Sequence, residues 1–217
     1  MASSVVALAN VKGGVGKSTC AVHLAEWMRH RGKQVILVDS DKQGSAAAWA
    51  VWRMTEAEKP APQITRLYEK ELLVQIPSLR EQYERIVIDT RGSDGAGTRA
   101  ALVVAQVVVV PVRDSDFDAA ALDDLMALIG EARALNPNLR AFAYLSQIDS
   151  RRAFPTELLA YMEEVGLVPL KTVIRHRAAF SKAGRGLSVF EIGDQKASEE
   201  MDSLCQEIEY ELAKTKK

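Results

Sequence analysis

A glycine-rich segment near the start of the chain holds the residue types that point most directly to chemistry. Residues 10–19 read NVKGGVGKST and follow a short apolar run at residues 5–9. Glycines let successive backbone N–H groups turn toward one anion, and a helix that starts directly after the loop adds its N-terminal dipole. The ammonium of Lys17 suits phosphate oxygens, and the hydroxyl of Ser18 suits Mg²⁺. The segment therefore predicts a site for the phosphates of a nucleotide.

The same segment departs in two places from the usual phosphate-binding pattern G-x-x-x-x-G-K-[ST]. Val11 stands where that pattern has its first glycine, and an additional lysine, Lys12, follows it. A glycine-rich turn that binds nothing is the alternative interpretation. The apolar run before the loop and the helical pattern after it favour phosphate binding, because both are needed to aim the backbone N–H groups.

Acidic residues follow two later apolar runs. Asp39 and Asp41 come after residues 35–38, and Asp89 comes after residues 86–88. Carboxylates at strand ends can hold a metal-bound water or orient an attacking water beside the phosphates. Each acidic turn alone is explained equally well as a solvated loop. Their order after a glycine-rich loop favours an Mg²⁺-dependent site.

The elements that must position these residues alternate along the chain between apolar runs and amphipathic segments. The pattern predicts strands at residues 5–9, 35–38, 86–88, 107–112, 140–145 and 170–174, and helices at 17–31, 45–54, 72–83, 98–105, 117–135, 156–165 and 198–213. Continuous apolar strands indicate a parallel sheet that is buried on both faces. We expect one α/β domain over residues 1–217, a doubly wound, mostly parallel sheet with helices on both faces and ligands at the carboxyl ends of its strands.

Composition excludes several classes of protein. With 47% hydrophobic and 26% charged residues, the chain is neither disordered nor collagen-like. Two cysteines, Cys20 and Cys205, form neither a disulfide framework nor a metal knuckle and suggest a reducing compartment. The chain starts with no secretory signal pattern, and its apolar stretches are too short to span a bilayer. We therefore expect a cytoplasmic protein.

A basic segment lies toward the C-terminal end. Residues 171–196 contain six Lys or Arg and two acidic residues, a net charge of 6 − 2 = +4. Because the whole chain has a net charge of −1, any attraction to nucleic acid requires a local patch of this kind. A solvated basic face is the alternative. Arg151 and Arg152, after another strand, are additional candidates. The candidate DNA contacts are Arg175, Arg177, Lys182 and Arg185.

The last predicted helix has one apolar and one acidic face. The apolar face comprises Met201, Leu204, Cys205, Ile208 and Leu212, and the other face carries Glu199, Glu200, Asp202, Glu207, Glu209 and Glu211. Anionic lipid repels such a helix, so it is not expected to anchor the protein to a membrane. Packing of the apolar face on the domain is the favoured interpretation.

Three of these segments together resemble a known family. Residues 12–19 (KGGVGKST), 39–43 (DSDKQ) and 87–90 (VIDT) look like the deviant-Walker-A ATPases of the ParA/MinD group, and residues 172–191 resemble the corresponding ParA segment. The resemblance covers nearly the whole chain. With about ten residues before the loop, the chain is similar to small ParA proteins of plasmid partition that lack an N-terminal helix-turn-helix domain.

The resemblance implies ATP and Mg²⁺ as cofactors, with slow, partner-stimulated hydrolysis. ATP would lie between two subunits, where Lys12 of each reaches the other's phosphates. Lys17 would neutralise the β- and γ-phosphates, and Asp41 would position the attacking water. The implied metal site has Ser18 bound to Mg²⁺, with Asp39 and Asp89 in the outer shell of the metal. The implied nucleotide contacts are Gly13, Gly14, Val15, Gly16, Lys17, Ser18, Thr19 and Pro111.

The resemblance also implies a cycle of assembly on DNA. The ATP-bound homodimer would bind DNA without sequence preference, associating with the nucleoid in the cytoplasm. A ParB-type centromere-binding adaptor would then stimulate hydrolysis and release the dimer. Two modest basic patches joined by dimerisation bind far more tightly than one. Plasmid partition is the first choice of cargo, with chromosome segregation and the positioning of a protein assembly as alternatives.

Three residues depart from the family pattern. Lys42 and Arg91 stand where the family usually has proline, and Ser146 stands where relatives often carry asparagine before the base-contacting loop. Arg91 adds charge close to the phosphates or to the dimer face.

Two other functions use the same fold. A MinD-like membrane-cycling ATPase needs a basic amphipathic tail, and residues 198–213 are acidic. The second function is that of a metabolic enzyme, either an ATP-dependent ligase or a metallocluster reductase. The reductase needs cysteine ligands at the dimer face, for which Cys20 and Cys205 are unsuitable. A ligase would turn over ATP only with a small substrate and would not respond to DNA.

Overall fold

A computed structural model describes residues 3–92, 95–114, 119–151 and 153–214. It contains a seven-stranded sheet in the order β3-β2-β4-β1-β5-β6-β7, in which every pair of neighbours is parallel. The strands are β1 (Ser4–Leu8), β2 (Val35–Asp39), β3 (Gln63–Arg66), β4 (Arg85–Asp89), β5 (Val107–Val112), β6 (Arg140–Ile148) and β7 (Val168–Arg175). The strand order reverses at β1, as in a doubly wound sheet. The predicted fold class is confirmed.

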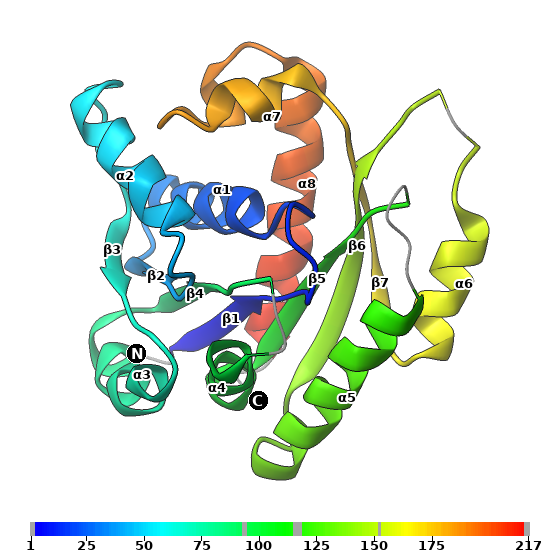
Figure 1. The fold of residues 1–217 in the computed structure, drawn as a ribbon. Coiled ribbons are helices and arrows are strands. Elements are labelled where there is room, and N and C mark those ends of the chain that lie inside the picture. Colours follow the sequence, from blue (N-terminus) through cyan, green and yellow to red (C-terminus); the bar gives the residue numbers. More distant parts are fainter. Residues whose placement is uncertain (1–2, 93–94, 115–118, 152, 215–217) are drawn as a thin grey trace.

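Helices cover both faces of this sheet (Figure 1). They are α1 (Lys17–His30), α2 (Ser45–Thr55), α3 (Lys70–Gln82), α4 (Ala96–Val104), α5 (Ala119–Leu135), α6 (Thr156–Glu164), α7 (Ala178–Ala183) and α8 (Gln195–Lys214), with a short 3₁₀ turn at Val189–Glu191. Helices α3, α4, α5 and α6 lie on one face, and α1, α2, α7 and α8 lie on the other.

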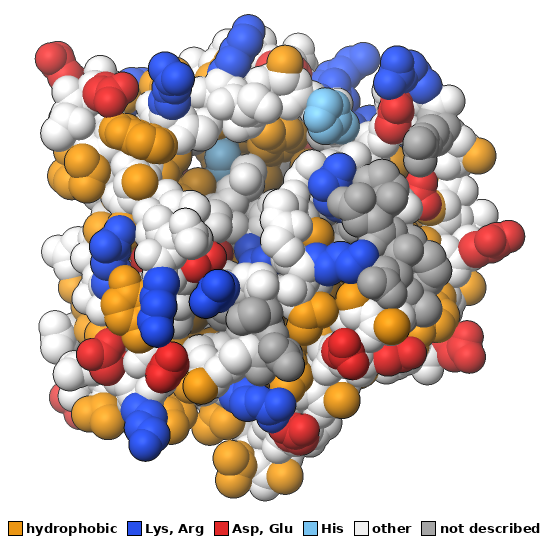
Figure 2. Space-filling model, viewed as in Figure 1, with side chains coloured by type: hydrophobic (Ala, Val, Ile, Leu, Met, Phe, Trp, Pro, Cys, Tyr) orange, Lys and Arg blue, Asp and Glu red, His pale blue; other side chains and the backbone are white. Residues whose placement is uncertain are grey.

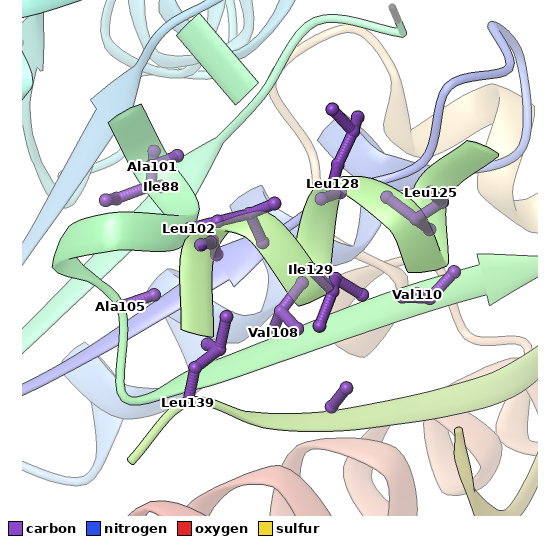
Figure 3. Packing of buried hydrophobic residues seen from close by; sticks show 14 of the residues in the cluster. Ile88, Ala101, Leu102, Ala105, Val108, Val110, Leu125, Leu128, Ile129 and Leu139 are labelled. Carbon is purple, nitrogen blue, oxygen red and sulfur yellow. The ribbon is translucent and has the colours of Figure 1, made fainter. Parts of the chain in front are cut away.

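Two apolar clusters, one on each face of the sheet, form the core. Successive residues of β1 alternate between them, with Val5 and Ala7 in one and Val6 and Leu8 in the other. This two-sided burial explains why the central strands are continuous apolar runs. Figure 3 shows the first cluster, where residues of α4 and α5 such as Leu102 and Ile129 pack over the strands.

Most predicted elements are present, with boundaries shifted by a few residues. The predicted helix at 117–135 begins at Ala119, and residues 117 and 118 lie outside the part that the structure describes. Strand β6 extends three residues beyond the predicted end, to Ile148. Sequence analysis missed β3 and α7, because each is short and neither shows a clear apolar period. Helix α3 contains Pro77 in its interior, where the proline is exposed.

The terminal helix α8 packs as predicted, with Met201, Leu204 and Ile208 buried. Its acidic residues are more than a solvated face. Glu209 accepts a hydrogen bond from Arg85 Nε at 2.9 Å, and Glu211 accepts one from Arg140 Nη1 at 2.8 Å. These ion pairs attach α8 to the amino ends of β4 and β6.

Candidate functional site

The glycine-rich loop connects β1 to α1 in a backbone shape that only glycine adopts easily. Gly14 has φ 71° and Gly16, which precedes the first turn of α1, has φ 102°. A Cβ at Gly16 would lie 3.0 Å from the hydroxyl oxygen of Ser146. A Cβ at Gly13 would meet no atom within 4 Å, so this part of the loop faces open space. The loop therefore has the shape that brings backbone N–H groups and a helix N-terminus to one anion.

Asn10 fixes the start of this loop. Its side-chain Nδ2 donates to the carbonyl oxygen of Pro111 at 2.8 Å, and its side-chain Oδ1 accepts the backbone N–H of Lys12 at 2.9 Å. Pro111, a predicted nucleotide contact, is buried in β5 and supports the loop through Asn10. Direct contact of Pro111 with a nucleotide stays a prediction.

Residues at the end of β6 hold the middle of the loop. The Ser146 hydroxyl donates to the carbonyl of Val15, and the Gln147 side-chain amide donates to the carbonyl of Gly14, both at 2.8 Å. Gln147 has φ 56°, a left-handed conformation that costs a non-glycine residue about 1 kcal/mol or more. Sequence reasoning missed Asn10 and Gln147 as loop supports. Their position could have indicated this role, because both are polar residues at or near the end of an apolar strand.

Lys17 lies within the site that the sequence predicted for it. Its ammonium donates to the carbonyl oxygen of Lys12 at 2.6 Å, and the residue is only 6% exposed. Burial lowers the pKa of Lys17, while the charges of Asp89 and Asp41 act in the opposite direction. The structure thus brings Lys17 and two of the predicted carboxylates into one electrostatic site.

Asp39 and Asp89 end adjacent strands and are paired in register across β2 and β4. Asp39 is buried and accepts N–H groups from Asp41 at 3.0 Å and Ala47 at 2.8 Å. Burial raises its pKa, and these hydrogen bonds oppose the increase. Asp41 is half-buried and accepts the N–H of Gln43 at 2.9 Å.

Asp89 is fully buried, and within the described residues neither of its carboxylate oxygens accepts a hydrogen bond. Burial raises its pKa to about 7; the Ser18 hydroxyl opposes this, lying close to the carboxylate although outside hydrogen-bonding geometry. A buried carboxylate without a hydrogen-bond partner is costly for the folded state, and a cation bound beside it would offset that cost.

The oxygen donors of this site fit Mg²⁺, which takes one or two carboxylates together with waters and substrate phosphates. Across residues 3–92, 95–114, 119–151 and 153–214, no group of three or more His, Cys, Asp or Glu forms a closed metal cage. A metal here would depend on the phosphates for further ligands. Ser18, Asp39 and Asp89 are the residues that would hold it, and this assignment stays a prediction.

A pocket of about 200 Å³ opens beside the loop. Its walls come from the loop and α1, the ends of β6 and β7, α7 and α8, and they include Gly16, Thr19, Ser146, Gln147, His176, Phe180 and Met201. Arg175 and Arg177, which were predicted to contact DNA, also line this pocket. Apolar and polar groups are mixed in its walls, which suits a heteroaromatic base with an attached sugar.

The other predicted DNA residues lie outside this pocket. Lys182 and Arg185 are exposed on α7 and in the loop after it, and Figure 2 shows Lys and Arg side chains along this edge of the molecule. Arg151 is exposed and pairs with Asp149 at 2.8 Å. Arg152 lies outside the described residues.

A glycine loop between a strand and a helix, with two strand-terminal carboxylates facing it, defines a P-loop nucleotide-binding protein of the doubly wound α/β class. Residues 6–189 match the family described as "CobQ/CobB/MinD/ParA nucleotide binding domain". The chain belongs to this ParA/MinD family of P-loop ATPases.

Two similar proteins have names that mention different cargoes, a carboxysome in one and a chromosome in the other. The chain is 30% identical over 207 residues to "Maintenance of carboxysome distribution protein A" of Halothiobacillus neapolitanus, covering 94% of this chain and 95% of that one. It is 33% identical over 167 residues to "Chromosome-partitioning ATPase Soj" of Thermus thermophilus, covering 64% and 67% of the two chains.

Solved structures share the fold. The cell division ATPase MinD of Pyrococcus furiosus superposes with a TM-score of 0.76 at 18% identity, covering 97% of this chain and 99% of that one. A putative plasmid partition protein of Borrelia burgdorferi, bound to AMPPNP, has a TM-score of 0.75 at 19% identity, covering 96% and 99%.

Proposed function

We propose that this protein is an Mg²⁺-dependent ATPase of the ParA type that couples its nucleotide state to binding of DNA. The observation that carries the nucleotide chemistry is Asp89, a buried carboxylate without a hydrogen-bond partner in the described chain, paired in register with Asp39 beside Lys17. Burying such a group is unfavourable for the folded state alone, and an Mg²⁺–phosphate ligand compensates it.

Each residue of the site has a separate role in the proposed hydrolysis. Backbone N–H groups of the loop and the α1 N-terminus hold the phosphates, and Lys17 neutralises their charge. Asp41 orients the attacking water, while Lys12 reaches the phosphates of a second copy of the chain. Mg²⁺, when bound, withdraws charge from the phosphate oxygens. The pocket beside Gly16 and Thr19 holds the adenine and ribose, which gives the loop a base-binding neighbour.

The ATP-bound homodimer is proposed to bind DNA without sequence preference through Lys182 and Arg185, with Arg175 and Arg177 as further predicted contacts. A ParB-type adaptor is proposed to stimulate hydrolysis and release the dimer. The membrane alternative has less support, because the apolar face of α8 is buried against the domain and is not available to insert into a bilayer. In the described part of the chain, no helix is both long and apolar enough to cross a bilayer.

Partition of a plasmid is the proposed cargo role. Positioning of a protein assembly is a second candidate, favoured by the 30% identity to a carboxysome distribution protein over 94% of this chain. The two roles share ATP-dependent DNA binding and differ in the adaptor. The product of a neighbouring gene that stimulates hydrolysis would separate them, because a partition adaptor also binds a centromere site and an assembly adaptor binds the assembly.

The primary test is binding to a random-sequence duplex with Mg²⁺-ATP, with Mg²⁺-ADP and without nucleotide, over a range of salt concentrations. The proposal expects binding only with ATP, falling steeply as salt rises. Absence of DNA binding in all three states, with ATP binding intact, would refute the DNA role and leave the ATPase assignment standing.

A further inference from the structure

Glu200, on the terminal helix α8, makes a cluster of contacts that the mechanism above does not use. Its carboxylate accepts hydrogen bonds from Arg177 Nη2 at 2.7 Å and Nε at 3.3 Å. It also accepts the backbone N–H of Arg175 at 3.0 Å and lies 3.7 Å from the Arg175 guanidinium. The Glu200 side chain is only 15% exposed. One carboxylate thus holds two arginines from a different part of the chain.

Both arginines are walls of the pocket beside the phosphate loop. They line it together with Gly16 and Thr19, and Met201, the residue after Glu200, also lines it. Between the arginines, the N–H of His176 donates to the carbonyl of Ile148 at 3.0 Å, which ties this segment to the end of β6. Helix α8 therefore reaches the candidate nucleotide site through Glu200 and Met201.

Removing the negative charge would change the shape of this wall. Arg175 and Arg177 are two positive groups close together, and a shared carboxylate both neutralises them and fixes their orientation. The two-nitrogen contact with Arg177 is the geometry in which a guanidinium binds a carboxylate best. Without it, each long side chain regains rotamer freedom and turns toward water.

We propose that Glu200 is a positioning residue for the nucleotide: it orients Arg175 and Arg177 as the wall of the base and ribose pocket and so links α8 to nucleotide binding. This inference rests on the proposed function, because it takes the ligand of the pocket to be a nucleotide. It assigns Arg175 and Arg177 to the pocket and leaves Lys182 and Arg185 as the exposed cations for DNA.

The test compares Glu200→Gln with Glu211→Gln in the full chain. Glu211 is a matched control, since it also forms ion pairs from α8, with Arg140 and Lys214, at the opposite end of the sheet. The two glutamates are eleven positions apart on the helix, a rise of about 16 Å. Affinities are measured for Mg²⁺-ATP, Mg²⁺-ADP and inorganic tripolyphosphate, which has the phosphates but no base.

Glu200→Gln is expected to weaken ATP and ADP to the same extent, by roughly tenfold, a typical effect of removing one charge-assisted hydrogen bond. Tripolyphosphate affinity is expected to stay as in the wild type. In hydrolysis assays KM rises while kcat is unchanged, because the reacting phosphate keeps its own ligands. Glu211→Gln is expected to leave all three affinities unchanged.

Three results would overturn the inference. Wild-type affinities for ATP and ADP in Glu200→Gln, with new DNA binding in the absence of nucleotide, would assign both arginines to the DNA surface. Equal weakening of tripolyphosphate would assign them to the phosphates. A wild-type protein that binds no nucleotide would refute the proposed function itself. If Glu200→Gln does not fold, Arg177→Lys asks the same question, and unchanged ATP affinity in that variant also contradicts the proposal.

Discussion

At the scale of single residues, Asp89 makes the link between stability and ligand binding measurable. Its pKa is about 7 in the folded protein against an ordinary value of 3.8. The folded state therefore holds this proton more tightly than the unfolded chain does. The contribution of Asp89 to stability is complete below pH 4 and is lost as the pH rises toward 7.

We expect Asp89→Asn to be more stable than the wild type above pH 7 in the absence of nucleotide and Mg²⁺. Three pKa units correspond to a gain of at most ~4 kcal/mol, which vanishes near pH 4. Mg²⁺-ATP should stabilise the wild type more than the variant, because an ionised carboxylate supports Mg²⁺ better than an amide, while the loop and Lys17 still bind the phosphates in both. Chemical denaturation at several pH values measures both effects. A stability difference that does not depend on pH would contradict the assigned pKa.

Gly92 gives a second prediction at this scale. A Cβ here would lie 2.8 Å from the carbonyl carbon and oxygen of Lys12 and 2.9 Å from Gly13 N, all backbone atoms. Gly92→Ala must therefore displace the phosphate loop, at about 1–3 kcal/mol for an overpacked site. If the loop moves to relieve this strain, nucleotide binding must restore it, and affinity falls roughly 5- to 150-fold.

The matched control for Gly92→Ala is Gly130→Ala in α5, where an added Cβ meets no atom within 4 Å. This change should raise stability by about 0.5–1 kcal/mol through helix propensity and leave nucleotide affinity unchanged. Titration with a fluorescent ATP analogue distinguishes the two variants. Equal affinities would show that the loop tolerates a side chain at Gly92.

At the scale of elements, the sequence predicts those strands and helices that show a clear local pattern of apolar residues. The buried central strands and the long helices are predictable because their apolar periodicity is continuous, as in residues 107–112, which match β5 in full. Edge strand β3 was missed, since its four residues have exposed ends and only partly buried centres. Helix α7 was missed because its six residues make fewer than two turns, which is too short to show a helical period.

The candidate site was predictable where its residues directly follow strands, and not where it depends on contacts between residues far apart in the chain. The glycine loop, Asp39 and Asp89 follow their strands directly, and parallel strands bring such residues to one edge of the sheet. The support from Ser146 to the Val15 carbonyl joins residues 131 positions apart, and no local pattern encodes it. The pairing of Glu200 with Arg177 also joins distant parts of the chain, so the basic segment could not be recognised as partly neutralised.

The attachment of α8 yields a prediction for this scale. Arg85 is only 2% exposed, and its charge is paired with Glu209 through two nitrogens. Glu209→Gln would leave a buried guanidinium without its counter-charge and should lower the free energy of unfolding by about 2–4 kcal/mol. Glu199→Gln, an exposed change on the same helix, should stay within about 0.5 kcal/mol of the wild type. Urea denaturation tests both, and similar stabilities would mean that α8 is held by its apolar face alone.

At the scale of the whole molecule, the proposed DNA binding would have to overcome a net charge of −1, so it would depend on where cations remain unneutralised. Helix α8 supplies carboxylates to Arg85, Arg140, Arg175 and Arg177. Lys182 and Arg185 are exposed, one in α7 and one just after it, and they form no ion pair with any residue that the structure describes. Dimerisation would double this small patch and make affinity depend on nucleotide.

We expect Lys182→Ala combined with Arg185→Ala to weaken ATP-dependent binding to a random duplex. The slope of log K against log salt should become shallower by roughly 1 for each DNA phosphate that the variant no longer neutralises. Lys33→Ala with Lys70→Ala removes the same charge from other parts of the surface and should leave the slope unchanged. Because both double variants shift net charge equally, a general weakening of attraction would alter both slopes alike. That outcome would show that binding follows overall charge, whereas a change confined to the first variant places the DNA on the α7 edge.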